Sequence, residues 1–129
     1  MKTFLTFLCA LVVLPALVFA TERYPSISEA ELKQAMAQKK VTLLDANGTD
    51  SWKAGHIPGA IDFESARENL AALLPGDKSA LIVAYCADPD CGAYNAAAKA
   101  AKDLGYTNIR HFSPGIEGWK ASGEPMEKG

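Results

Sequence analysis

The sequence predicts an α/β domain with a doubly wound, mostly parallel sheet flanked by helices on both faces. Short apolar runs alternate with segments of helical pattern along the chain, which is the order of elements in a parallel sheet. The most hydrophobic run, residues 80–85, shows no apolar–polar alternation, as expected for a strand buried on both faces. Asp45 ends one run and Cys86 follows another. Because ligands of such folds bind at the carboxyl ends of the strands, we expect Cys86 to lie at the functional site.

Residues 1–20 stand apart from this pattern. Lys2 precedes a long apolar stretch that contains Pro15 and ends in a small residue, Ala20, before polar sequence. This arrangement predicts a signal peptide at residues 1–20 and a single domain at residues 21–129. An uncleaved anchor is the alternative, although the stretch is near the lower length limit for a membrane span. We expect export, with the periplasm as the destination and no stable anchor after cleavage; an extracellular destination fits the same signal.

The composition restricts the partners. The 129 residues carry 13 basic and 15 acidic side chains, a net charge of −2. A mildly acidic, mixed surface argues against nucleic acid and anionic membranes as partners. Of the three cysteines, Cys9 lies in the expected signal. The exported domain therefore keeps Cys86 and Cys91, in a compartment where disulfides persist.

Caps, apolar faces and helix breakers predict the elements of the N-terminal half. Ser28 and Glu31 form a capping box for a surface helix within residues 28–40. Residues 41–46 form a buried strand, 47–55 a loop with one helical turn capped by Asp50, and 60–63 a brief strand. A helix within residues 64–77 has Leu70, Leu73 and Leu74 facing inward and stops at Pro75 and Gly76.

The C-terminal half continues the alternation. A strand at residues 80–85 is followed by a loop and an alanine-rich helix from 93 to 104, closed by Gly105. A further strand at 108–112, a turn at 113–115 and a short helix at 116–123 complete the domain.

Three blocks of this sequence resemble the single-domain rhodaneses, a family of sulfurtransferases. The first is the aspartate-ended strand with "GHIPGA" at residues 55–60, the second is the strand that leads to Cys86, and the third is the closing pattern around Gly105-Tyr106 and Gly115 to Trp119. The resemblance covers nearly all of residues 21–129. It implies a rhodanese-like fold and a sulfurtransferase that needs no metal and no other cofactor.

The resemblance also implies a mechanism. Cys86 is the nucleophile, and backbone N–H groups around it suit a thiolate and then a persulfide. The partners are a small sulfur donor such as thiosulfate and a thiol or cyanide acceptor. A structural role for Cys86, as a small buried hydrophobe, is the alternative. The active-site loop that this implies consists of Ala87, Asp88, Pro89, Asp90, Cys91, Gly92, Ala93 and Tyr94.

The loop departs from the family pattern. It is longer than the usual loop, and Ala93 and Tyr94 stand where basic and hydroxyl residues are common. Asp88 and Asp90, which we expect to point to solvent, disfavour a dianionic donor, so activity with thiosulfate is expected to be weak. The longer loop also suggests the related phosphatases. However, Gly92 lies six residues after Cys86 and the loop has no arginine to hold a phosphoryl group.

Several roles are possible for Cys91. It could resolve a Cys86 persulfide or sulfenic acid by forming a disulfide, or it could belong to a stable disulfide that only closes the loop. A zinc site with Asp88 or Asp90 lacks a third strong ligand nearby. A second hypothesis for the whole domain is therefore a non-catalytic or redox-switched binding or sensing module that uses a Cys86–Cys91 disulfide.

The remaining candidates are expected to be structural. His56 bonds backbone near the "GHIPGA" turn, with a catalytic base as the alternative, and Asp45 caps local N–H groups. His111, toward the end of a strand, is expected to face solvent at a sheet edge, and a position near the Cys86 sulfur is the alternative. Trp52 and Trp119 wedge short helices against the sheet.

Overall fold

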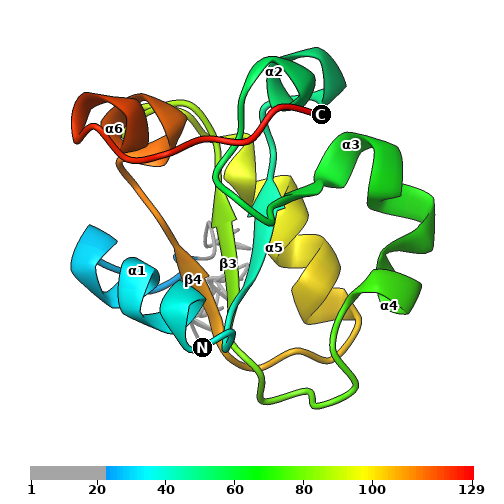
Figure 1. Cartoon of the computed structure of the whole chain (residues 1–129). Helices are drawn as coiled ribbons and strands as arrows, with labels where there is room; N and C mark the ends of the chain where they lie inside the picture. Colours follow the sequence, from blue (N-terminus) through cyan, green and yellow to red (C-terminus); the bar gives the residue numbers. More distant parts are fainter. Residues whose placement is uncertain (1–22) are drawn as a thin grey trace, which may run out of the picture.

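The structure, a computed structural model, describes residues 23–129. The expected signal peptide at residues 1–20 lies outside these residues. Four parallel strands form one sheet in the order β2-β1-β3-β4, namely β1 (Thr42–Asp45), β2 (Ile61–Asp62), β3 (Ile82–Tyr85) and β4 (Ile109–His111). The predicted α/β class and parallel sheet are confirmed. Figure 1 shows the arrows of β3 and β4 pointing toward the end of the sheet where α2 (Thr49–Ala54) and α6 (Gly115–Ala121) lie.

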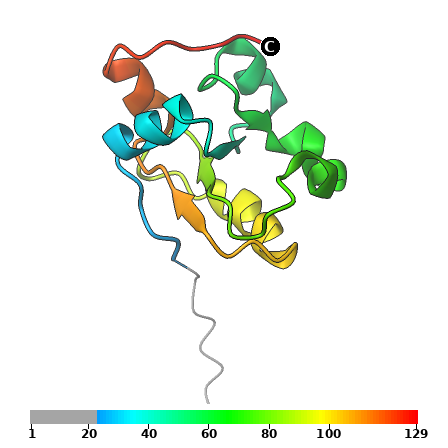
Figure 2. The same ribbon diagram turned by 60° about the horizontal axis from the view of Figure 1, so that its bottom comes forward.

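Helices cover both faces of the sheet. On one face, Leu44, Ile82 and Ala84 pack against α5 (Tyr94–Asp103) and the segment from α3 (Phe63–Ala66) through the 3-10 turn η1 (Arg67–Asn69) to α4 (Leu70–Leu73). On the other face, Leu43, Val83 and Tyr85 pack against α1 (Glu29–Ala37) and α6. Figure 2 shows these two groups of helices on opposite sides of the strands. Strand β3 carries buried side chains on both faces, which explains its unbroken apolar run.

Alanines let α5 lie close to the sheet. Ala97, Ala98 and Ala101 are fully buried along one side of this helix. Helix α1 begins as predicted, because the Ser28 hydroxyl accepts a 3.1 Å hydrogen bond from the Glu31 amide. Both helices thus follow directly from local sequence signals.

Two local expectations were wrong. Helix α2 begins after Gly48 and not at Asp50; the Thr49 amide donates instead to the Glu64 carboxylate at 2.7 Å. The helix expected within residues 64–77 is broken into α3, η1 and α4, and Leu73 is 48% exposed. The break rotates Leu73 outward while Leu70 and Leu74 stay in the core.

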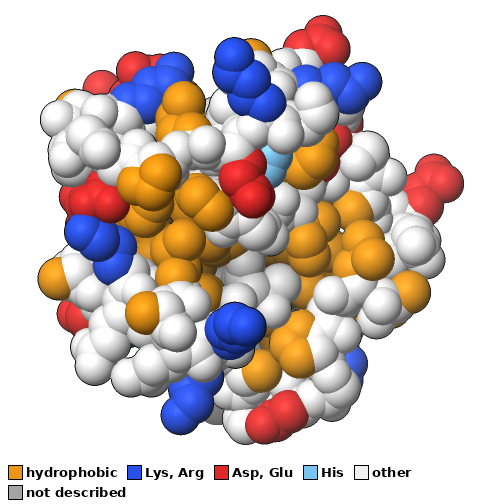
Figure 3. Space-filling model, viewed as in Figure 1, with side chains coloured by type: hydrophobic (Ala, Val, Ile, Leu, Met, Phe, Trp, Pro, Cys, Tyr) orange, Lys and Arg blue, Asp and Glu red, His pale blue; other side chains and the backbone are white. Residues whose placement is uncertain are grey.

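The surface carries both charges. Figure 3 shows basic and acidic side chains interspersed over the face seen there. No helix within residues 23–129 is long and apolar enough to cross a membrane.

Candidate active site around Cys86

Cys86 follows β3, a central strand of the sheet, at the carboxyl edge. The backbone there is held by α6: the Cys86 and Ala87 carbonyls accept hydrogen bonds from the amides of Ile116 and Glu117, both at 2.9 Å. Gly115 makes this approach possible. Its φ is +64°, and a Cβ at this position would lie 2.6 Å from the carbonyl oxygens of both Cys86 and Ala87. The start of α6 therefore sets the position of Cys86.

The sulfurs of Cys86 and Cys91 form a disulfide, with their Cα atoms 6.2 Å apart. The spacing of the two cysteines allowed this disulfide but did not require it. Cys86 is only 1% exposed, whereas Cys91 is half-buried. A disulfide sulfur is not a nucleophile, so chemistry at Cys86 requires the bond to be opened first.

Asp88 folds the loop back on itself. Its carbonyl accepts from the Cys91 amide at 3.1 Å, and its side-chain Oδ1 accepts from the Asp90 amide at 2.9 Å. Such aspartate-bonded turns are a common way to close a short loop. Asp90 is exposed and Asp88 is half-buried. The turn at Asp88 thus returns Cys91 to the position where it meets Cys86.

The amides expected around the sulfur are only partly available. Those of Asp90 and Cys91 already donate to Asp88. Those of Gly92 and Ala93 donate to no acceptor within the part of the chain that the structure describes, and α5 has no side-chain cap. Because Cys91 lies three residues before α5, its bond to Cys86 places both sulfurs near the open amino end of a ten-residue helix. Uncapped amides at a helix start favour an anion.

His111 is buried at the end of β4, and the expectation that it faces solvent was wrong. Its ring stacks on Tyr94, the first residue of α5, with ring centroids 3.4 Å apart and planes 5° from parallel. The segment before α1 covers the outer edge of β4, since the Ile27 amide donates to the His111 carbonyl at 3.0 Å. Burial lowers the pKa of the imidazole, and its Nε2 has no hydrogen-bond partner among the described residues. The stack fixes the start of α5 beside the disulfide loop.

Asn47 is a candidate that the sequence analysis missed. It follows β1, where the Ala46 amide donates to the Tyr85 carbonyl at 2.9 Å, and its own amide donates to Asp45 Oδ1 at 2.8 Å. Its side-chain Nδ2 is buried and makes no hydrogen bond of regular geometry to residues 23–129, although the Asn47 side chain lies near enough to the Asp45 carboxyl to lower its pKa against the larger effect of burial. Asn47 lines a cavity of about 180 Å³ that also contacts Ala87, and another of about 310 Å³ that contacts Ala93. An amide donor therefore lies beside both ends of the loop; no motif in the sequence marked it.

Asp45 caps local amides as expected, and it also joins a buried network. Its Oδ2 accepts a 2.7 Å hydrogen bond from the Tyr85 hydroxyl, which in turn accepts from the Ile57 amide at 3.1 Å. Burial raises the pKa of the Asp45 carboxyl. Burial, together with the charge of Asp45, raises the pKa of the Tyr85 phenol. The network joins β1, β3 and the "GHIPGA" segment beneath the site.

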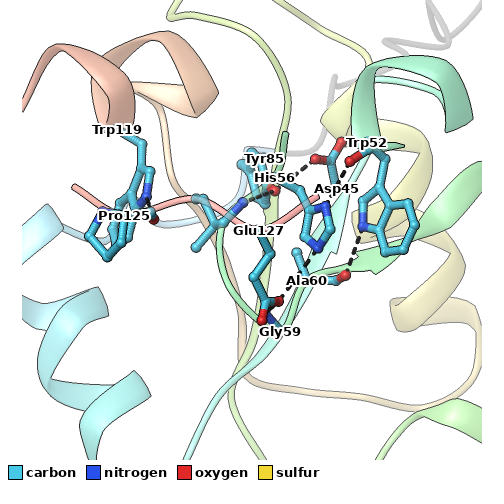
Figure 4. Close-up of polar contacts among 10 residues, drawn as sticks. Asp45, Trp52, His56, Gly59, Ala60, Tyr85, Trp119, Pro125 and Glu127 are labelled. Carbon is cyan, nitrogen blue, oxygen red and sulfur yellow. Dashed lines mark hydrogen bonds and ion pairs between the residues drawn. The ribbon is translucent and has the colours of Figure 1, made fainter. Parts of the chain in front are cut away.

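The "GHIPGA" segment is held by the C-terminal residues (Figure 4). His56 Nδ1 lies 2.7 Å from the Trp52 carbonyl, and the two rings stack with centroids 4.1 Å apart. The backbone of Glu127 exchanges two 2.9 Å hydrogen bonds with His56, and its carboxylate accepts from the Gly59 amide at 2.7 Å. These contacts agree with the structural role expected for His56. Trp119 is also structural: it is buried, and its Nε1 donates to the Pro125 carbonyl.

Comparison with known proteins agrees with this geometry. The rhodanese-like domain family matches residues 28–122. The chain belongs to the rhodanese-like domain family. Solved rhodanese-like structures include a rhodanese-related protein from Thermoplasma volcanium, 26% identical with a TM-score of 0.60, covering 81% of this chain and 98% of that one. The human single-domain sulfurtransferase TSTD1 is 23% identical with a TM-score of 0.60, covering 77% and 97% of the two chains. At that identity, the human protein shows the shared fold.

A curated relative places the same domain in a different setting. The HTH-type transcriptional regulator Rv0324 of Mycobacterium tuberculosis is 34% identical over 105 residues, which are 81% of this chain. The match spans only 45% of the regulator's length. This rhodanese-like domain therefore has relatives both as separate proteins and as part of a larger regulator.

Proposed function

We propose that the protein is a sulfurtransferase in which reduced Cys86 carries sulfane sulfur as a persulfide. The observation that carries this proposal is the position of the Cys86 sulfur, after the central strand β3 and near the uncapped start of α5. A free thiol is mostly protonated at neutral pH, and a helix amino end lowers its pKa toward the reactive thiolate. Membership of the rhodanese-like family supports the same reaction class.

The proposed cycle has two displacements. The Cys86 thiolate attacks the sulfane sulfur of a donor such as thiosulfate, the donor's S–S bond breaks, and sulfite leaves with the bonding electron pair. The acceptor, cyanide or a thiolate, then attacks the outer sulfur of the persulfide, and Cys86 leaves as a thiolate. The buried amide of Asn47, beside the cavity that contacts Ala87, is suited to donate to an oxygen of the donor.

Intact mass measurement tests the proposal. Fully reduced protein, freed of reductant and treated with thiosulfate, is expected to gain the mass of one sulfur and to lose it when cyanide is added. Cys91→Ser is the matched control and should still load, whereas Cys86→Ser should not. Failure of reduced wild type and Cys91→Ser to load from thiosulfate or from any other sulfane donor would contradict the proposal.

The disulfide favours one alternative function, a redox-switched binding or sensing module without catalysis. In that case the bond between Cys86 and Cys91 is itself the signal. The loading experiment separates the two, because a module would take up no sulfur even when fully reduced.

Export is proposed together with the function. A disulfide that persists suits an oxidising compartment such as the periplasm. Expression of the full chain in a Gram-negative host, followed by fractionation and N-terminal sequencing, should find a periplasmic protein that starts at Thr21. A chain that starts at Met1 in the cytoplasmic fraction would contradict export.

A further inference from the structure

The two cysteines of the disulfide differ in exposure. Cys86 is 1% exposed beneath the loop, at the end of a strand whose residues are all buried. Cys91 is half-buried, and its sequence neighbours Asp90 and Gly92 are both exposed. A nucleophile from solvent therefore meets Cys91 before it meets Cys86.

Access decides the direction of thiol–disulfide exchange. The attacking thiolate must reach one sulfur, and the other sulfur leaves with the bonding electrons. Attack at Cys91 makes Cys86 the leaving group, and a thiol of lowered pKa leaves faster. The uncapped amides of Gly92 and Ala93 at the start of α5 favour such an anion near the loop.

We propose that the oxidised protein is opened by small thiols at Cys91, which forms a mixed disulfide while Cys86 is released as a thiolate. One S–S bond forms between Cys91 and the thiol as the Cys86–Cys91 bond breaks. A second thiolate attacks the mixed disulfide, frees the oxidised thiol pair and leaves both cysteines reduced. The exchange does not depend on sulfur transfer; only its consequence, the activation of Cys86, rests on the proposed function.

The charge of the loop selects the class of thiol. Asp90 precedes the attacked residue and Asp88 closes its turn, and neither takes part in an ion pair in residues 23–129. In water-like surroundings, a carboxylate about 6 Å from the reacting sulfur lowers the rate of attack roughly threefold for a thiol that carries one additional negative charge. A cationic aminothiol is accelerated by a similar factor. The preferred reductant is thus a small thiol that carries a positive charge or no charge besides its thiolate.

Peptide mapping of the first exchange tests the direction. Oxidised wild type is mixed briefly with 2-mercaptoethanol, and new thiols are alkylated at once under acid quench. Cleavage before Asp88 and Asp90 separates the two cysteines into different peptides. The expected result is the mixed disulfide on Cys91 and the alkyl group on Cys86. A mixed disulfide on Cys86, an equal distribution, or reaction only after denaturation would each overturn the proposal.

A charge series tests the selectivity. Cysteamine, 2-mercaptoethanol and 3-mercaptopropionate are compared at equal thiolate concentration and low ionic strength. The exchange rates should fall in that order, by about threefold or more from each thiol to the next. Asp90→Asn should reduce the rate differences among the three thiols. Equal rates for the three thiols, or a series that Asp90→Asn leaves unchanged, would overturn the charge selection. Sulfur loading is measured separately on reduced protein, so a failure of the proposed transferase would not be mistaken for a failure of exchange.

Discussion

The hydroxyl of Tyr85, the last residue of β3, donates a 2.7 Å hydrogen bond to Oδ2 of Asp45, the last residue of β1. Both side chains are buried, and the same hydroxyl accepts from the Ile57 amide. One phenol thus connects two strands and the "GHIPGA" segment at the point where Cys86 leaves the sheet.

Tyr85→Phe tests this connection. The change leaves Asp45 Oδ2 and the Ile57 amide without their partner, so we expect a loss of about 1–3 kcal/mol in the free energy of unfolding. Urea denaturation of the oxidised proteins measures it. Tyr106→Phe is the control, since the Tyr106 hydroxyl donates to the Pro75 carbonyl and no hydrogen bond of this network depends on it. Equal losses for the two variants would show that the network adds nothing.

Gly115→Ala tests the close approach of α6 to Cys86. A β-carbon there meets backbone atoms 2.6 Å away and also requires a φ of +64°. Gly123→Ala is the matched control, with a φ of +75° and nothing within 4 Å of its Cβ. Backbone strain alone costs about 1–2 kcal/mol. The unfolding free energy should therefore fall by about that amount in Gly123→Ala and clearly further in Gly115→Ala; equal losses would deny the steric contact.

His111 predicts a pH dependence of stability. Burial lowers its pKa in the folded state, so the unfolded chain binds the proton more readily. The stability linked to His111 is complete above the unfolded pKa, near 6.5, and is lost as the pH falls through the lower folded pKa.

His111→Phe retains a ring for stacking on Tyr94 and removes the titration. Between pH 7 and 5, wild type should lose more unfolding free energy than the variant, by at most about 1.4 kcal/mol per pH unit. Chemical denaturation at several pH values measures this difference. Parallel curves for the two proteins would show that His111 does not titrate in this range.

Asp90→Asn should accelerate the loading of reduced protein by thiosulfate. Removing the exposed negative charge of Asp90 from the loop raises the rate roughly threefold for each negative charge on the donor, and salt weakens the effect. Intact mass measurement of samples quenched at successive times gives the rate. Glu68→Gln, an exposed acid on η1, is the control for net charge. A gain of the same size in the control would assign the effect to the whole protein and not to the loop.

Much of the fold could be predicted because its signals are local. The Ser28 N-cap, the unbroken apolar run of β3 and the alanines of α5 each depend on a single element, and all three are confirmed. Of the predicted capping box, the bond from the Glu31 amide to the Ser28 hydroxyl is present, and the Glu31 carboxylate accepts from that hydroxyl. The break between α3 and α4 could not be predicted. Leu73 has the same spacing as a core residue, and only the path of the chain around Phe63 and Leu70 turns it outward.

The candidate site divides in the same way. The order of residues alone determined that Cys86 would follow a central strand, and that Cys91 and the two acidic side chains Asp88 and Asp90 would belong to the same short loop. That the two sulfurs meet was decided by the tertiary structure. The tertiary structure decided that Cys86 is buried while Cys91 is partly accessible, that His111 stacks on Tyr94, and that the Asn47 amide lies beside the loop without a partner. These features arise because α5, α6 and the turn after β1 meet at one edge of the sheet. The spacing of residues within a single element does not predict where separate elements meet.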